Sequence, residues 1–222
     1  MCYYVAYNYI TLMSIDSFNK KILSLGRNGR WAEGIPLIKR ELKKHDLGNR
    51  LELTVSLAAF LYHNAFQDGT FDIKSDANSK LAFKICRDII DNNPHSKEKS
   101  IINARIFLAQ MLAAAHKKEA INIARTTYRI CKDALTANRL ANVYEILGKK
   151  TIAEKYYLIY EDLSKDDKQH LPYVYLDLAN FYRNINDVKK LDKYIGKIKK
   201  TRFYLSNRSF RNLVRVRMQK SQ

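Results

Sequence analysis

The stretch from residue 140 to residue 157 constrains the fold most, because it predicts two short helices joined by a tight turn. Ala141 and Tyr144 lie three residues apart, on one face of the first helix. Gly148 ends that helix, since glycine adopts positive φ without the steric penalty of a side chain. Ala153 then begins the apolar face of the second helix. Small residues at both crossing points allow the two backbones to approach, so the stretch predicts a packed helical hairpin.

Tyr157 and Tyr160 continue the face that begins at Ala153, at spacings i+4 and i+7. This order of small, aromatic, glycine, small and aromatic residues resembles the tetratricopeptide repeat. The resemblance covers about residues 17–200 and is specific only from residue 101 to residue 198. It implies an all-α, right-handed α-solenoid of about five stacked hairpins, because one short hairpin cannot bury its own apolar face.

The same register recurs along the chain. The small positions of successive second helices fall at Ala82, Ala120, Ala153 and Leu191, with spacings of 38, 33 and 38 residues. The repeat family has a period of about 34 residues. In the last hairpin Asn186 replaces the turn glycine, and asparagine is the next best residue for a left-handed backbone. Further helices are expected at residues 17–27, 31–45, 51–62, 80–92, 101–115, 172–184 and 187–200, with a long loop over 63–78.

The first hairpin also resembles a second repeat family. Phe18 and Asn19, followed by the segment 29–33, are similar to a pentatricopeptide repeat. That weaker resemblance implies recognition of single-stranded RNA, in which Asn19 takes part in base choice. Pro36 falls inside the second helix of this hairpin and is expected to bend or shorten it.

Three regions are predicted: an apolar extension over residues 1–15, a repeat domain over 16–205, and a basic amphipathic capping helix over 206–222. The first region has no Lys or Arg, which argues against a signal or transit peptide and leaves initiation at Met13 open. No apolar run approaches the roughly 20 residues that span a bilayer, so no membrane contact is expected. Three widely spaced cysteines do not indicate a disulfide framework, so we expect a cytoplasmic location.

The sequence offers no catalytic constellation. It lacks the phosphate-binding loop pattern and the dinucleotide-binding glycine fingerprint. Its five histidines stand far apart, with no second histidine at i+3 or i+4 of any of them. We therefore expect no catalytic residue, no metal and no cofactor, and we expect each histidine to be at the surface or half-buried. A non-enzymatic protein is predicted.

Charge gives one indication of function, because the chain carries a formal net charge of +18. The segment 189–222 holds seven lysines and five arginines against one acid, Asp192, a net of +11. Such a local positive field favours a nucleic acid, RNA foremost, or an acidic protein, although lysine-rich helices are usually solvated. Tyr194 is one of several interleaved aromatic residues that either stack on bases or pack inward. The predicted basic patch comprises Lys199, Lys200, Arg202, Arg208, Arg211 and Arg215.

A second indication comes from the repeat resemblance, which implies a concave groove lined by the first helix of each hairpin. Asn142 and Asn180 occupy the same slot of two repeats. The resemblance implies that this slot faces the groove, where an asparagine often bonds the backbone of a bound peptide in that family. The residues predicted to face this groove are Arg105, Asn138, Asn142, Asn180 and Arg183. The two-carboxylate clamp of chaperone-binding members is not expected, since Arg139 and Asp177 stand where its asparagine would be.

These observations favour a non-enzymatic scaffold that binds a protein or peptide partner, possibly an acidic one, in its groove. The alternative is a nucleic-acid-binding protein that uses the basic C-terminal face. The sequence does not indicate an oligomeric state.

Overall fold

The computed structural model describes residues 17–44, 47–69, 71–113 and 116–201, and this part of the chain is all-α, with no strand. The predicted fold class is therefore confirmed. The helices are α1 (Ser17–Arg27), α2 (Trp31–Leu42), α3 (Leu47–Gln67), α4 (Ala77–Asp91), α5 (Lys99–Leu112), α6 (Lys117–Cys131), α7 (Ala134–Ile146), α8 (Lys150–Leu163), α9 (Leu171–Asn184) and α10 (Val188–Lys199). The predicted regions 1–15 and 206–222 lie outside the described residues.

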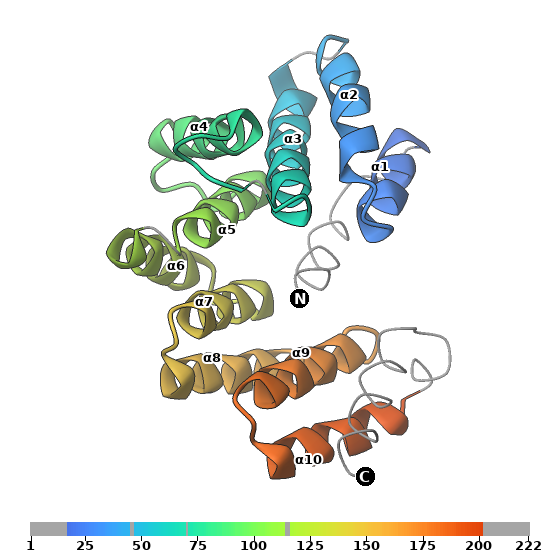
Figure 1. The fold of residues 1–222 in the computed structure, drawn as a ribbon, viewed down its shortest axis with the longest axis vertical. Helices are drawn as coiled ribbons and strands as arrows, with labels where there is room; N and C mark the ends of the chain where they lie inside the picture. Colours follow the sequence, from blue (N-terminus) through green and yellow to red (C-terminus); the bar gives the residue numbers. More distant parts are fainter. Residues whose placement is uncertain (1–16, 45–46, 70, 114–115, 202–222) are drawn as a thin grey trace. The chain divides into compact units, whose positions relative to one another are not determined.

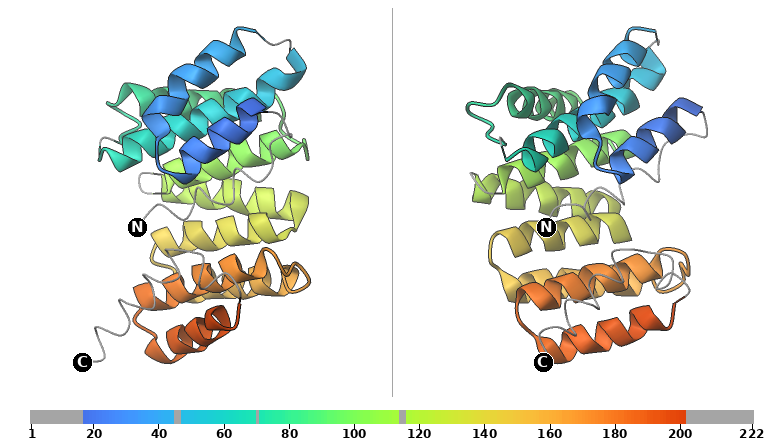
Figure 2. Two further views of the ribbon diagram at one scale, coloured as in Figure 1. Left: turned by 90° about the vertical axis from the view of Figure 1, so that its right-hand side faces the viewer. Right: turned by 45° about the vertical axis from the view of Figure 1, so that its right-hand side comes forward.

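The helices belong to two compact units, the first ending at Cys131 and the second beginning at Lys132. In the first unit each helix from α1 to α6 packs against the next, and α3 also contacts α5 (Figure 1). In the second unit α7 packs on α8, α8 on α9 and α9 on α10. Both views in Figure 2 show α9 and α10 side by side. Within each unit, hairpins thus follow one another in chain order, as in a solenoid.

The turns of these hairpins adopt the backbone conformation that the sequence predicted. Gly29 and Gly148 have φ of 71° and 70°, in the left-handed region that disfavours a side chain. Asn186 has φ of 61° and ends α9 in the same way. Each of these residues closes a helix before its partner helix begins.

The residues placed at helix crossings form the core. Ala82, Ala120 and Ala153 have no exposed surface, and Leu191 is buried as well. Most of the large side chains that fill the space beside such positions are aromatic, and Tyr144, Tyr160, Tyr182, Tyr194, Phe107 and Phe181 are among the most completely buried. Burying aromatic rings of this size supplies a large part of the apolar stabilisation of a small helical unit.

Several predicted helix boundaries are wrong, and α3 shows two of them, since it begins at Leu47 and not at residue 51, and continues past residue 62. The loop expected over 63–78 begins only after Gln67, because α3 continues through His63 and Ala65 with the same helical apolar spacing. His63 was expected at the surface or half-buried, but it is buried with its ring stacked on Trp31, the centroids 4.6 Å apart. The shortened loop ends at Asp76, whose carboxylate accepts the amide of Ser79 and caps α4. Proline inside α2 is tolerated, and that helix ends three residues short of its predicted end.

Candidate functional site

The candidate site lies in the second unit, on α7 and α9. The start of α7 is fixed by a capping box: the Asp133 carboxylate accepts the Thr136 amide at 2.8 Å, and the Thr136 hydroxyl accepts the Asp133 amide at 3.3 Å. The start of α9 carries Pro172 in its first turn, where the missing amide proton costs nothing. The residues that share a face of each helix then follow from its period of 3.6 residues per turn.

Six polar residues line neighbouring faces of these helices at i+3 and i+4 spacings. They are Asn138, Asn142 and Glu145 on α7 and Asp177, Asn180 and Asn184 on α9, and we call them the amide–carboxylate face. Asn138 is buried, Asn184 is exposed, and the other four are half-buried. Packing against the core holds the half-buried side chains of the amide–carboxylate face in place, and their exposed parts still reach solvent.

The first part of this face is a chain of amide hydrogen bonds. Asn138 donates through Nδ2 to Asp177 Oδ2 at 3.0 Å. Asn142 donates through Nδ2 to Asn138 Oδ1 at 2.7 Å and to the Asn138 carbonyl at 2.8 Å. Asn142 is thus held in one orientation by the residue one turn before it. Its Oδ1 atom has no partner among the described residues.

The second part is centred on Glu145. Its Oε2 atom accepts the Tyr157 hydroxyl at 2.6 Å, and its Oε1 atom accepts Asn184 Nδ2 at 2.8 Å. Burial, together with the nearby carboxylate, raises the pKa of Tyr157 well above its usual value, so the phenol stays a donor at neutral pH. The carboxylate of Glu145 therefore links α7, α8 and α9.

The two cross-helix bonds have the same register. Asn138 and Asp177 are 39 residues apart, and so are Glu145 and Asn184. The second pair lies seven residues after the first on both helices. The same 39-residue separation at both places means that α7 and α9 run parallel, with a constant shift in residue number. This is the geometry expected between corresponding helices of stacked repeats.

Asp177 is the titratable group with the most perturbed acidity on this face. Burial raises its pKa to about 7, and the charge of Glu145 acts in the same direction. The Arg139 charge and hydrogen bonds from Asn138 and Tyr160 favour the ionised form but do not cancel the effect of burial.

Tyr160 connects Asp177 to a histidine. The Tyr160 hydroxyl lies 3.4 Å from Asp177 Oδ2 and 2.9 Å from His170 Nε2. Burial lowers the pKa of His170, so its imidazole is neutral at physiological pH. A neutral ring next to a carboxyl that titrates near neutrality keeps the buried charge of this cluster low.

The groove residues predicted from the sequence are not all together. Asn138, Asn142, Asn180 and Arg183 are in the second unit, where Asn180 and Arg183 are half-buried. Arg105 is in the first unit, buried, and its guanidinium donates to the carbonyl oxygens of Asn93 and Pro94 at 2.8 and 2.7 Å.

Arg105 therefore binds the backbone of the segment that follows α4. Burial lowers the pKa of its guanidinium. Asn138 also has internal partners only. The remaining members, Asn142, Asn180 and Arg183, retain surface. Peptide binding by these residues stays a prediction.

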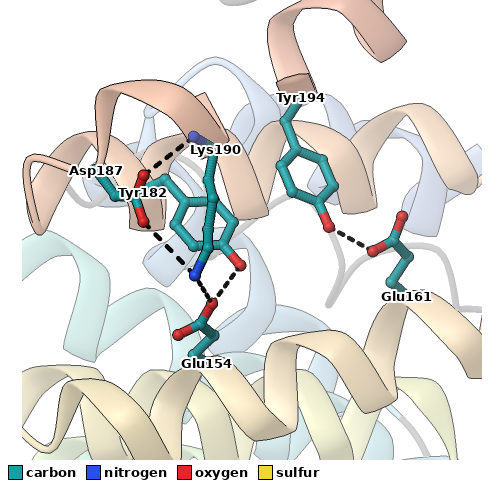
Figure 3. A network of polar contacts seen from close by, with 6 residues as sticks. All are labelled: Glu154, Glu161, Tyr182, Asp187, Lys190 and Tyr194. Atoms are coloured by element: carbon teal, nitrogen blue, oxygen red, sulfur yellow. Dashed lines mark hydrogen bonds and ion pairs between the residues drawn. The ribbon is translucent and has the colours of Figure 1, made fainter. Parts of the chain in front are cut away.

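The basic end of the described chain is α10. Side chains of α9 and α10 form a second polar network with two glutamates of α8 (Figure 3). Glu154 accepts the Tyr182 hydroxyl at 2.8 Å and the Lys190 ammonium at 2.6 Å. Glu161 accepts the Tyr194 hydroxyl at 2.5 Å and also pairs with Lys197. The bond from Lys190 lowers the pKa of Glu154 and keeps it ionised.

This network also shows a constant register, since Glu154 and Lys190 are separated by 36 residues, as are Glu161 and Lys197. The proposed stacking of Tyr194 on bases is wrong, because Tyr194 is buried against Tyr182, the parallel rings being 5.5 Å apart. The alternative, that this aromatic residue packs inward, is confirmed.

The basic patch is described only in part. Lys199 and Lys200 are exposed at the end of α10. Arg202, Arg208, Arg211 and Arg215 lie outside the described residues. Two other lysines of α10, Lys190 and Lys197, are neutralised by glutamates of α8, so the sequence count overstates the free positive charge of that helix.

Sequence reasoning missed the carboxylates. Glu145 and Asp177 anchor the amide–carboxylate face, yet neither was predicted to contribute to a site. The available signal was that two amide–carboxylate pairs, one from the first half of α7 and one from its end, share the same separation of 39 residues. Periodicity within one helix does not reveal such pairs, because they depend on the shift between two helices.

No family model, no curated protein and no solved structure matches this chain. Within the described ranges, no three His, Cys, Asp or Glu side chains come together in a way that could hold a metal ion. None of the ten described helices combines the length and the apolarity that crossing a membrane requires.

Proposed function

We propose that this chain is a helical-repeat protein of tetratricopeptide type that binds an extended segment of a partner protein along α7 and α9. Three features support the repeat type: the buried small residues at the crossings, the left-handed turn residues, and the constant register between alternate helices. The proposed class of activity is non-enzymatic, and the proposed location is the cytoplasm.

The observation that carries the proposal is the unused hydrogen-bonding capacity of two half-buried asparagines. The side-chain amide of Asn180 forms no hydrogen bond with another described residue, and Asn142 Oδ1 has none either. A primary amide offers both a donor and an acceptor, which matches the alternating amide and carbonyl groups of an extended peptide. Asparagine is a mediocre helix former, so the two on α7 and α9 cost stability that binding would justify.

The test uses a displayed library of random twelve-residue peptides, selected on the purified full chain. The enriched peptides are then synthesised and titrated against the full chain and against Asn142→Ala with Asn180→Ala. We expect the double variant to bind at least tenfold more weakly, because two hydrogen bonds to a peptide backbone contribute about 1 kcal/mol each. Circular dichroism establishes that both proteins have the same helix content.

A matched control is Asn28→Ala with Asn122→Ala, which removes two exposed amides from the first unit. This control should bind the selected peptides as the unaltered chain does. Equal binding by the unaltered chain and by the α7/α9 double variant would exclude the proposed groove. Failure to enrich any peptide would also count against it.

A second candidate function is binding of RNA by the basic end, which one observation favours. Lys189, Lys193, Lys199 and Lys200 are exposed on or next to α10, and none forms an ion pair with another described residue. A row of unneutralised lysines favours phosphate contacts. The alternative partner for the same lysines is an acidic protein surface.

We expect single-stranded RNA to bind the full chain at near-physiological salt, and binding to weaken in a version that ends at Thr201. Exchange of the four exposed lysines for glutamine should weaken it as well. Binding no tighter than millimolar, or unaffected by both changes, would exclude this candidate and leave an acidic protein partner to be tested.

A further inference from the structure

The outward face of α6, in the first unit, carries a regular row of long polar side chains. Lys118, Asn122, Arg125 and Arg129 recur at i, i+4, i+7 and i+11, and all four are exposed. The opposite face of the same helix, with Ala120, Ala124 and Thr127, is buried. The row therefore points directly away from the core, and we call it the α6 basic row.

Charge on this row is of one sign. The helix contains a single acid, Glu119, and that carboxylate pairs with Arg87 of α4. No acidic residue belongs to the row itself. Lys117 and Lys132, at the two ends of the helix, are also exposed and add to the positive field.

The length of the row suits a strand of phosphates. Eleven residues of α-helix rise about 16 Å. A nucleic-acid strand in a B-form helix places one phosphate about every 3.4 Å, so about five phosphates fit along the row. Two of the three basic residues are arginines, whose planar guanidinium binds a phosphate through two parallel hydrogen bonds.

We propose that the α6 basic row binds the sugar–phosphate backbone of a nucleic acid without reading its bases. Phosphates would lie along Lys118, Arg125 and Arg129, and the Asn122 amide would donate to a phosphate or sugar oxygen between them. The row has no aromatic side chain, so bases find no stacking platform there and sequence preference is absent. This proposal is independent of the peptide groove and of the basic end on α10.

Two other polyanionic partners fit less well. A membrane-surface helix inserts an apolar face among the lipids, whereas the apolar face of α6 is already buried inside the first unit. A protein interface is built around an apolar or aromatic centre, and the α6 basic row has no such residue. A phosphate backbone requires only the positive charges and donors that are present.

The experiment measures binding of a fluorescein-labelled 20-nucleotide single-stranded RNA, and of a 20-base-pair DNA duplex, by fluorescence anisotropy between 50 and 200 mM salt. The full-length chain is compared with Lys118→Gln/Arg125→Gln/Arg129→Gln. For single-stranded RNA, we expect the triple variant to flatten the slope of log affinity against log salt by about 2, since each contact contributes about 0.7. Its affinity at 100 mM salt should fall at least tenfold.

A matched control removes one lysine and two arginines from elsewhere in the first unit: Lys20→Gln/Arg27→Gln/Arg40→Gln, all exposed on α1 and α2. It has the same net charge as the triple variant and should keep most of the salt slope. Equal losses in the two variants would reduce the effect to net charge and overturn the proposal. Absence of binding by the unaltered chain would overturn it too.

Folding of the variants is checked by thermal unfolding. If the triple variant loses helix, Arg129→Gln alone is measured, with an expected slope change of about 0.7. Arg125→Lys/Arg129→Lys keeps the charge and should keep the slope. Competition by anionic lipid vesicles or polyglutamate as strong as that by unlabelled RNA would assign the row to a different partner and refute the nucleic-acid assignment.

Discussion

At the scale of single residues, Gly34 of α2 lies in close contact with the ring of Phe60 on α3. A methyl group added there would overlap the ring of Phe60. That ring cannot simply turn away, because it is 2% exposed and packs edge-on against Trp31 with centroids 5.0 Å apart. We expect Gly34→Ala to destabilise the first unit by about 1–3 kcal/mol through overpacking, despite the higher helix propensity of alanine.

The control for this prediction is Gly196→Ala on α10. A Cβ atom at Gly196 would meet nothing within 4 Å, so only helix propensity changes. This variant should gain up to about 1 kcal/mol. Urea unfolding of both proteins measures the difference, and an equal effect of the two substitutions would rule out a special contact at Gly34.

Asp177 contributes to the free energy of unfolding with a pH dependence opposite in sign to that of a carboxylate whose pKa is lowered by folding. Its pKa in the folded chain, about 7, lies above the ordinary value of 3.8 because of burial. Between these values the folded state binds a proton that the unfolded state has lost. The Asp177 contribution to the free energy of unfolding therefore falls as pH rises from about 4 to 7, by at most about 1.4 kcal/mol per pH unit.

The variant Asp177→Asn lacks this titration while keeping an oxygen that accepts the Asn138 amide. We expect the variant to gain stability relative to the unaltered chain as pH rises from 5 to 7, and the difference to level off above 7. Urea unfolding at half-unit pH steps measures it. A constant difference across this range, or a carboxyl resonance titrating near pH 4, would show that Asp177 is not perturbed.

At the scale of helices, the sequence predicted what depends on neighbouring residues. Periodic small and aromatic residues located most of the hairpins, and Gly148 and Asn186 were recognised as turns because only their local conformation mattered. The end of α3 was misplaced because His63 is a polar residue type that usually marks the surface. In the structure its ring stacks on Trp31 in an aromatic core. Local propensity does not contain that tertiary contact.

The candidate site was predictable only in part for the same reason. Asn142 and Asn180 were placed on the correct helices, and the structure leaves both half-buried. Their carboxylate neighbours were missed because the pairs span 39 residues, a shift fixed by how α7 and α9 pack. Arg105 was given a groove position from its repeat slot, but it bonds the backbone after α4 instead.

Buried tyrosines of α9 and α10 donate to glutamates of α8, and Tyr194 on α10 provides the clearest test. Tyr194→Phe removes the hydroxyl that donates to Glu161 and leaves the ring stack with Tyr182 in place. We expect a loss of about 1 kcal/mol. In a double-mutant cycle with Glu161→Gln, the coupling energy should be about 0.5–1.5 kcal/mol, measured by urea unfolding. Zero coupling would mean that the two side chains do not bond in solution.

At the scale of the whole molecule, the chain divides into two compact units. The first buries rings such as Trp31, Phe60 and Phe107, and the second buries Tyr144, Tyr160 and Phe181. A substitution inside one core therefore acts mainly on the unit that contains it.

The single tryptophan makes this testable, because Trp31 belongs to the first unit and its fluorescence reports that unit alone. Ala153 has no exposed surface in the second unit, so Ala153→Leu should overpack that core by about 1–3 kcal/mol. We expect the helical circular dichroism signal to lose part of its amplitude at lower urea, while the Trp31 transition keeps its midpoint. Gly34→Ala should do the reverse, moving the Trp31 transition. If Ala153→Leu shifts both signals equally, the two units unfold as one cooperative structure, which would contradict the prediction.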